Sequence, residues 1–370
     1  MQTSSLKILA LTVGVFFFTN NLSTSFLPVY YMETGLSVAE IAQLLFSTFT
    51  VIGLLPIMLL KFMKNFEKII TFGILSTALF FAALIYVKNP IILGLTYGLG
   101  IATFWPSFNL LQFRLSETRI RARTVSLFSS IIPSIASIIG PAVGGFMAST
   151  FGFPTLFTIS IALYIVAFLL SRRIKFQSET HKFAIPKDKT FKIFFVSFIL
   201  LGLSEAYWLA YPLFVNKISG GTFQMGLVLA ASAVLICAVT FLVNWLSDIK
   251  KTRINFAIIG AFLNALWYFA IPFASTPQEI VALSLLSGFA SAFSLSWFAH
   301  YGDSFSKEYY ASILVMLEVG LMIGRILNLA PTNIFISNAN YTSYFTLLGL
   351  VWILIIPLYL IAKRTKTNAI

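Results

Sequence analysis

The chain has 370 residues, of which 58% are hydrophobic and 10% are charged, and its mean hydropathy is +0.91. This composition excludes an ordinary soluble domain, because too little polar surface remains to cover one. The formal net charge of +13 is typical of nucleic-acid binding only where the basic residues gather on one surface.

Apolar stretches recur along the whole chain, and each is long enough to cross a hydrocarbon core of about 30 Å as a helix. They lie at 8–30, 38–60, 69–87, 90–113, 124–149, 153–171, 191–214, 222–246, 254–273, 277–300, 311–333 and 341–362. We therefore predict an all-α integral membrane protein with twelve transmembrane helices and almost no extramembrane domain.

The basic residues follow the order of these spans. If the N-terminus is cytoplasmic, all 25 Lys and Arg except Lys88, Lys217 and Arg325 fall in segments on the cytoplasmic side. This bias predicts a multi-pass protein of the cell membrane with both termini in the cytoplasm. It explains the net charge without a nucleic-acid partner, and the basic loops are suited to anionic lipid headgroups.

The sequence contains no set of residues typical of an enzyme. The single cysteine, Cys237, lies in the eighth span, so an intrachain disulfide is excluded. The two histidines, His181 and His300, belong to no cluster with metal-ligand spacing, and no Gly-x-x-x-x-Gly-Lys loop is present. We expect no enzymatic activity, no cofactor and no metal. Transport by this chain would draw on an ion gradient or on the gradient of the substrate itself.

The longest polar stretch (171–190) divides the chain after six spans, and a second copy of the first half begins there. Asn20 corresponds to Glu205 and Gly35 to Gly220 at an offset of 185, and "IIGP" (138–141) corresponds to "MIGR" (322–325) at 184. We predict two six-helix bundles related by an internal repeat, at 1–171 and 191–370, joined by a cytoplasmic loop at 172–190.

Six plus six spans with a basic central loop resemble the major facilitator superfamily over nearly the whole chain. In the fifth span, "SIASIIGPAVGGFM" (134–147) is similar to the antiporter motif of that family, with Gly140, Pro141, Gly144 and Gly145 at the matching positions. Small residues four apart allow helices to approach closely, and the proline bends its helix. The resemblance implies that this motif serves packing during conformational change and contacts no substrate.

A second motif follows the eighth span, where "NWLSDIKKTR" (244–253) resembles the loop signature of the family through Asp248, Lys250, Lys251 and Arg253. Asn244 stands where the family has glycine, and the first-half loop "LLKFMKNFEK" (59–68) has no such aspartate. The resemblance implies a latch on one conformation. A solvated basic loop that only follows the topology bias is the alternative.

Three ionisable residues lie deep inside spans, away from the span ends, namely Glu205, Glu318 and Arg325. Glu205 and Arg325 lie at a similar depth from the cytoplasmic side, and the resemblance implies that the seventh and eleventh helices are neighbours. We therefore predict a Glu205–Arg325 pair. Glu318 lies seven residues before Arg325, nearly two turns away on the same face, which makes it a second partner. Proton coupling is one role for this set, and pinning the two helices together is the alternative.

Polar and aromatic residues also lie inside the first, fourth, seventh and tenth spans, on one helix face in the fourth and tenth, and the resemblance implies that these four helices surround a central substrate cavity. The predicted cavity residues are Asn20, Asn21, Trp105, Asn109, Gln112, Tyr207, Trp208, Tyr211, Ser287, Ser291, Ser294 and Trp297. Taken singly, each of them is equally typical of helix packing or of an interfacial anchor.

The sequence thus favours a monomeric secondary transporter, with a small-molecule substrate, protons and membrane lipids as partners. We expect proton-coupled export of a small, partly apolar organic compound by alternating access. Three alternatives stay open: symport or facilitated uptake of a polar nutrient, a lipid or lysolipid flippase, and a non-transporting membrane sensor or scaffold.

Overall fold

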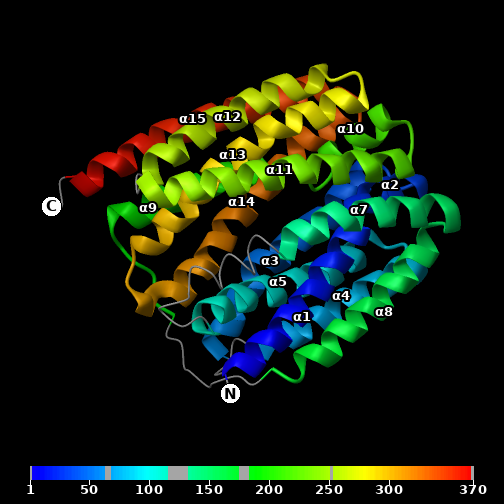
Figure 1. Cartoon of the computed structure of the whole chain (residues 1–370), viewed down its shortest axis with the longest axis horizontal. Helices are drawn as coiled ribbons and strands as arrows, with labels where there is room; N and C mark the ends of the chain where they lie inside the picture. The colour runs from blue at the N-terminus through cyan, green and yellow to red at the C-terminus, as the bar shows by residue number, and fades with distance from the viewer. Residues whose placement is uncertain (1, 63–67, 116–131, 175–182, 251–252, 368–370) are drawn as a thin grey trace. The chain divides into compact units, whose positions relative to one another are not determined.

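The computed structural model describes residues 2–62, 68–115, 132–174, 183–250 and 253–367, and every regular element in them is a helix (Figure 1). Side chains at 2–6, 112–115, 241, 244–250, 253, 295–296, 299, 303, 307 and 364–367 are outside the description. The helices of the first half are α1 (Gln2–Ser23), η1 (Thr24–Phe26), α2 (Leu27–Glu33), α3 (Val38–Phe62), α4 (Ile69–Tyr86), α5 (Pro90–Leu115), α7 (Ile132–Phe151) and α8 (Phe153–Ser171). Those of the second half are α9 (Lys189–Leu203), α10 (Ala210–Ser219), α11 (Thr222–Lys250), α12 (Arg253–Ala270), η4 (Ile271–Phe273), α13 (Pro277–Asp303), η5 (Lys307–Tyr309), α14 (Tyr310–Ile336) and α15 (Tyr341–Thr367).

Within the described ranges, ten helical segments are long and apolar enough to cross a membrane. Two of the twelve predicted spans are missing from this set. The seventh is divided between α9 and α10, which are 15 and 10 residues long and individually too short. The tenth is α13, a 27-residue helix with serines along its middle. The all-α membrane fold expected from the sequence is confirmed.

The chain forms two compact units, residues 1–182 with 220–230 and residues 183–219 with 231–370. In the first unit, α1 packs on α7 and α8, and α4 packs on α5 and α8. In the second unit, α9 packs on α14 and α15, and α12 packs on α13 and α15. These are the same pairs in the same order, so the internal repeat seen in the sequence is also a repeat of helix packing.

Two glycines at the repeat offset have the same backbone role. Gly35 follows α2 with φ 86°, and Gly220 follows α10 with φ 77°. This left-handed conformation costs little only for glycine, and it ends the first span of each half.

Close packing at a second pair of glycines also repeats. A Cβ added to Gly140 in α7 would lie 2.7 Å from the Cβ of Asn21 in α1, and one added to Gly324 in α14 would lie 2.6 Å from the backbone nitrogen of Leu203 in α9. Neither contact leaves room for a side chain, so these glycines set how closely the paired helices approach.

Candidate functional site

The seventh span is interrupted where its charged residue lies. Helix α9 ends at Leu203 and α10 begins at Ala210, so Glu205 lies in an unwound segment. The prediction of one continuous helix over 191–214 is wrong at this point. Pro212 contributes to the interruption, because it has no N–H to bond the carbonyl of Trp208 and its ring would clash there.

Side chains from neighbouring helices bond the carbonyl groups that the break releases. Tyr268 donates its hydroxyl to the carbonyl oxygen of Ser204 at 2.5 Å, and Asn328 Nδ2 donates to the carbonyl oxygen of Glu205 at 2.8 Å. Without such partners, buried backbone groups in a membrane span would each cost several kcal/mol. The unwound segment is therefore held in place by α12 and α14.

Asn328 is itself oriented by a small network. Its Oδ1 accepts a hydrogen bond from the Tyr344 hydroxyl at 3.1 Å, and Thr332 Oγ1 donates to that hydroxyl, also at 3.1 Å. The residues predicted from the sequence did not include Asn328, Tyr344 or Tyr268. One signal was available for Asn328: it lies three residues after Arg325 and so close to the same helix face.

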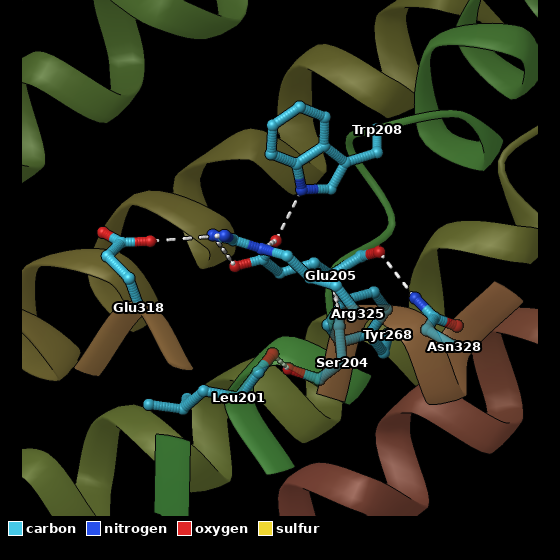
Figure 2. A network of polar contacts seen from close by, with 8 residues as sticks. All are labelled: Leu201, Ser204, Glu205, Trp208, Tyr268, Glu318, Arg325 and Asn328. Carbon is cyan, nitrogen blue, oxygen red and sulfur yellow. Dashed lines mark hydrogen bonds and ion pairs between the residues drawn. The ribbon is translucent and has the colours of Figure 1, made fainter. Parts of the chain in front are cut away.

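Arg325 and Glu205 form a bidentate ion pair (Figure 2). Arg325 Nε donates to Glu205 Oε2 at 2.7 Å, and Nη2 donates to Oε1 at 3.0 Å. Trp208 adds a third donor, because its Nε1 bonds Glu205 Oε2 at 2.5 Å. The guanidinium carbon of Arg325 also lies 5.4 Å from the centre of the Trp208 ring, within range of a cation–π contact. The Glu205–Arg325 pair predicted above is thus present.

Glu318 approaches the same guanidinium group from the opposite side (Figure 2). Arg325 Nη1 lies 3.5 Å from Glu318 Oε2, which is longer than the usual 2.7–2.9 Å of a charge-assisted hydrogen bond. The side chains of Arg325, Glu205 and Glu318 are 8%, 15% and 16% exposed. One buried guanidinium group therefore faces two carboxyl groups, and it is bound tightly to only one of them.

Close helix packing brings these residues together. A Cβ added to Gly324 would overlap the carbonyl oxygen of Ile199, and one added to Gly202 would overlap the carbonyl oxygen of Leu321. Gly324 directly precedes Arg325, and Gly202 lies three residues before Glu205. Glycine on both helices thus allows the α9 and α14 backbones to approach each other next to the ion pair.

The first unit has no equivalent ion pair among its described residues. At the repeat positions, Asn20 and Asn21 stand for Glu205, and Pro141 stands for Arg325. Asn21 Nδ2 donates to the carbonyl oxygen of Phe17 at 2.9 Å in its own helix. Pro28, the equivalent of Pro212, follows a short 3-10 turn at Thr24–Phe26, so the first span is distorted but not opened.

The other predicted cavity residues lie in varied surroundings. Asn20, Asn109, Trp105, Tyr211, Ser287 and Ser294 are half-buried, and Tyr207 and Ser291 are exposed. The Trp105 ring lies 5.6 Å from that of Phe17, and the Tyr211 ring 5.5 Å from that of Trp267. Ser294 Oγ accepts a hydrogen bond from Asn264, which joins α13 to α12.

Trp297 differs from the rest of this set. Its side chain is fully buried, its Nε1 donates to Ser197 Oγ at 3.0 Å, and its ring stacks on that of Tyr359 at 3.9 Å. These contacts tie α13 to α9 and α15, and they give Trp297 a packing role in the structure as described.

The residues of the fifth-span motif occupy a close helix contact, as the small-residue pattern predicts. Gly140 and Gly144 face Asn21 and Leu22 of α1, and a Cβ added to Gly145 would lie 2.8 Å from the carbonyl oxygen of Thr222 within the same unit. The side chains of Gln112, Asp248, Lys250 and Arg253 lie outside the described residues, so the structure does not test the loop motif. Within the described residues, no group of three His, Cys, Asp or Glu could hold a metal ion.

Comparisons with known proteins show which family model and which solved structure this chain matches. The family model described as Major Facilitator Superfamily matches residues 8–190 and 193–369. The crystal structure of the nucleoside transporter NupG superposes with a TM-score of 0.72 over 98% of this chain and 100% of that one. Its sequence identity is 15%, so it shows a shared fold.

Curated relatives match shorter stretches. "Uncharacterized protein YqgE" of Bacillus subtilis is 25% identical over 177 residues, 45% of this chain and 41% of that protein. "Methylenomycin A resistance protein" of Streptomyces coelicolor is 32% identical over 123 residues, 32% of this chain and 26% of that protein. A protein of the same description in Bacillus subtilis is 28% identical over 154 residues, 41% of this chain and 31% of that protein. The matched stretches thus span less than half of these relatives.

Proposed function

The chain belongs to the Major Facilitator Superfamily of membrane transporters, and we propose that it exports a small, partly apolar organic compound in exchange for protons. The observation that carries this proposal is the buried set of Glu205, Arg325 and Glu318 at the break in the seventh span. Ionisable groups inside membrane spans are typical of proton relays and of ion or substrate sites. In this superfamily the transport site lies near the bilayer midplane.

Stability alone gives a poor reason to keep such groups. A buried ion pair contributes little more than well-packed apolar side chains of similar volume, and it often contributes less. Charged residues inside membrane spans are therefore typical of functional sites such as proton relays and ligand-binding sites. The bidentate Glu205–Arg325 contact and the loosely held Glu318 differ in strength, which suits an arginine whose weaker contact is made and lost as protons bind and leave.

Alternating access then follows the rule for this superfamily, in which the two halves rock around a site near the bilayer midplane. In this proposal residues 1–171 and 191–370 form the halves, and the predicted polar and aromatic residues of the first, fourth, seventh and tenth spans line the site. The surplus of basic residues in alternate loops supports a cell-membrane location with both termini in the cytoplasm.

Two observations favour export. Two relatives are named as methylenomycin A resistance proteins, and resistance of this kind fits removal of the compound from the cell. The Gly-Pro-x-x-Gly-Gly pattern at residues 140–145 resembles the antiporter motif. Uptake of a polar nutrient is the second candidate, because Asn20, Ser287 and Ser291 offer groups that could bind hydroxyls and the fold is shared with a nucleoside transporter.

Growth of an efflux-deficient bacterium that expresses the protein tests the direction of transport. The panel contains methylenomycin A, other small organic antibiotics and toxic nucleoside analogues. Export predicts a several-fold rise in the inhibitory concentration of at least one antibiotic, which a protonophore abolishes. The exposed Glu33→Gln variant is the matched control. Sensitisation to a nucleoside analogue with no protection against any antibiotic would instead support uptake.

A further inference from the structure

The two glutamates of the ion-pair set differ in what holds them, and this difference separates their roles. We propose that Glu318 is the residue that takes up and releases the proton, whereas Glu205 holds Arg325 in both states. The inference rests on the proposed proton coupling and assigns it to one carboxyl group.

Glu205 is saturated with donors. Its two carboxylate oxygens receive Arg325 Nε, Arg325 Nη2 and Trp208 Nε1 at 2.5–3.0 Å. Its backbone carbonyl is bound by Asn328 as well. Protonation of Glu205 would have to displace charge-assisted bonds of the strongest kind found in proteins, and it would leave Arg325 with its weaker partner.

Glu318 has one partner among the described residues, Arg325 Nη1 at 3.5 Å. Its second carboxylate oxygen has no contact of that kind there. A proton can therefore bind at little cost in hydrogen bonds, since the proton would replace only one long contact.

Charge balance leads to the same assignment. Two ionised carboxylates and one guanidinium group leave a buried net charge of −1, which a low-dielectric interior disfavours. When hydronium gives its proton to a carboxylate oxygen of Glu318, water is released and the set becomes neutral. Arg325 then pairs with Glu205 alone.

Among the side chains that the structure describes, Arg325 is the basic group that acts on Glu318. On α14 itself its charged neighbour is Arg325, and from the unwound segment Glu205 and Tyr207 interact with it electrostatically. Helix α9 has no titratable residue between Lys192 and Glu205.

The tyrosines that α13 and α15 place against α14 bond other positions. Tyr301 donates to the carbonyl of Ile313, and Tyr344 donates to Asn328. A proton on Glu318 would thus act on Arg325. Because Arg325 also bonds Glu205, the effect would reach the break in the seventh span.

Trp208 provides a reporter that needs neither substrate nor gradient. Its indole bonds Glu205 and its ring lies over Arg325, so a change in how Arg325 is shared alters its fluorescence. The experiment titrates the purified full-length protein from acidic to alkaline pH. Two signals are followed. The first is the fluorescence of Trp208, obtained as the difference between the wild type and Trp208→Phe, and the second is the infrared band of protonated carboxyl groups.

We expect one titrating group in the wild type and in Glu33→Gln. Glu318→Gln should remove both the fluorescence step and the infrared band, while Glu205→Gln and Glu205→Asp should keep the band of Glu318 at a shifted midpoint. A step that survives in Glu318→Gln, or that is absent from the wild type, would overturn the inference.

The two proposals can fail independently. If Glu318 titrates but the transport rate does not depend on the proton gradient, the proposed function fails and the assignment of the titrating group to Glu318 stands. If transport is proton-coupled and the step belongs to Glu205, the assignment fails and the function stands.

Discussion

Arg325 holds Glu205 through two parallel hydrogen bonds of 2.7 and 3.0 Å, yet it reaches Glu318 through one contact of 3.5 Å. The tight contact joins α14 to the unwound part of the seventh span, and the loose one lies within α14. Protonation of Glu318 would therefore change how Arg325 bonds Glu205, and so the contact between α14 and the seventh span, while Glu318 stays in place.

Removal of Arg325 should destabilise the protein more than neutralisation of either glutamate. Arg325→Ala leaves two buried carboxyl groups without their cation, which costs about 3–5 kcal/mol, whereas Glu205→Gln keeps a hydrogen-bonding side chain. Melting temperatures in detergent provide the comparison, with Leu327→Ala as the control because Leu327 is 54% exposed two residues away. An Arg325→Ala protein as stable and active as the wild type would contradict the account of the ion pair.

Asn328 should matter more than its distance from the charges indicates. Asn328→Ala removes the donor to the Glu205 carbonyl and leaves a buried acceptor unpaired, at a cost of about 1–3 kcal/mol. Tyr344→Phe should cost less, because the amide of Asn328 can still reach that carbonyl. Thermal unfolding of both variants measures the difference, and equal losses would show that Asn328 does not support the break.

The glycine contact between α9 and α14 should be intolerant of a methyl group. Gly324→Ala places a Cβ against the backbone of Ile199 and Leu203, and overpacking of this kind costs about 1–3 kcal/mol. Gly302→Ala is the matched control, since a Cβ there meets nothing within 4 Å. We expect Gly324→Ala to lower the melting temperature and the transport rate, while Gly302→Ala changes neither. Equal behaviour of the two would mean that the helices separate freely at this point.

Trp208→Phe separates the hydrogen bond from the ring contact. Phenylalanine keeps an aromatic face for Arg325 but removes the Nε1 donor to Glu205. The protein should remain folded and transport should fall several-fold, because Glu205 is then less firmly held. Initial rates in vesicles test this, and unchanged rates would assign Trp208 to packing only.

The sequence predicted the fold because its signals are local and strong. Spans of about 20 apolar residues, alternating basic loops and paired glycines at a fixed offset require no knowledge of tertiary contacts. These features can be read from positions along the chain alone. The Glu205–Arg325 pair needed more: equal depth selected the two residues, and the family resemblance implied that the seventh and eleventh helices are neighbours.

Other parts of the site depend on geometry that periodicity does not contain. A proline is tolerated inside a continuous helix elsewhere in the chain, as Pro331 is in α14, so Pro212 did not predict a break on its own. Trp297 fits a polar stripe by spacing, but its contacts with Ser197 and Tyr359 arise from two distant helices. The roles of Asn328 and Tyr268 likewise become clear only from the structure, in which they bond the backbone carbonyls of Glu205 and Ser204 at the break.

The most direct test of the central claim is proton movement in proteoliposomes that enclose a pH-sensitive dye. The compound that most raises the melting temperature, from a panel of methylenomycin A, other antibiotics, nucleosides and lysolipids, is added on one side. The account predicts that wild-type protein moves protons opposite to the compound, and that Glu318→Gln still binds the compound but moves no protons. Wild-type transport of the compound with no proton movement, or full coupling in Glu318→Gln, would contradict it.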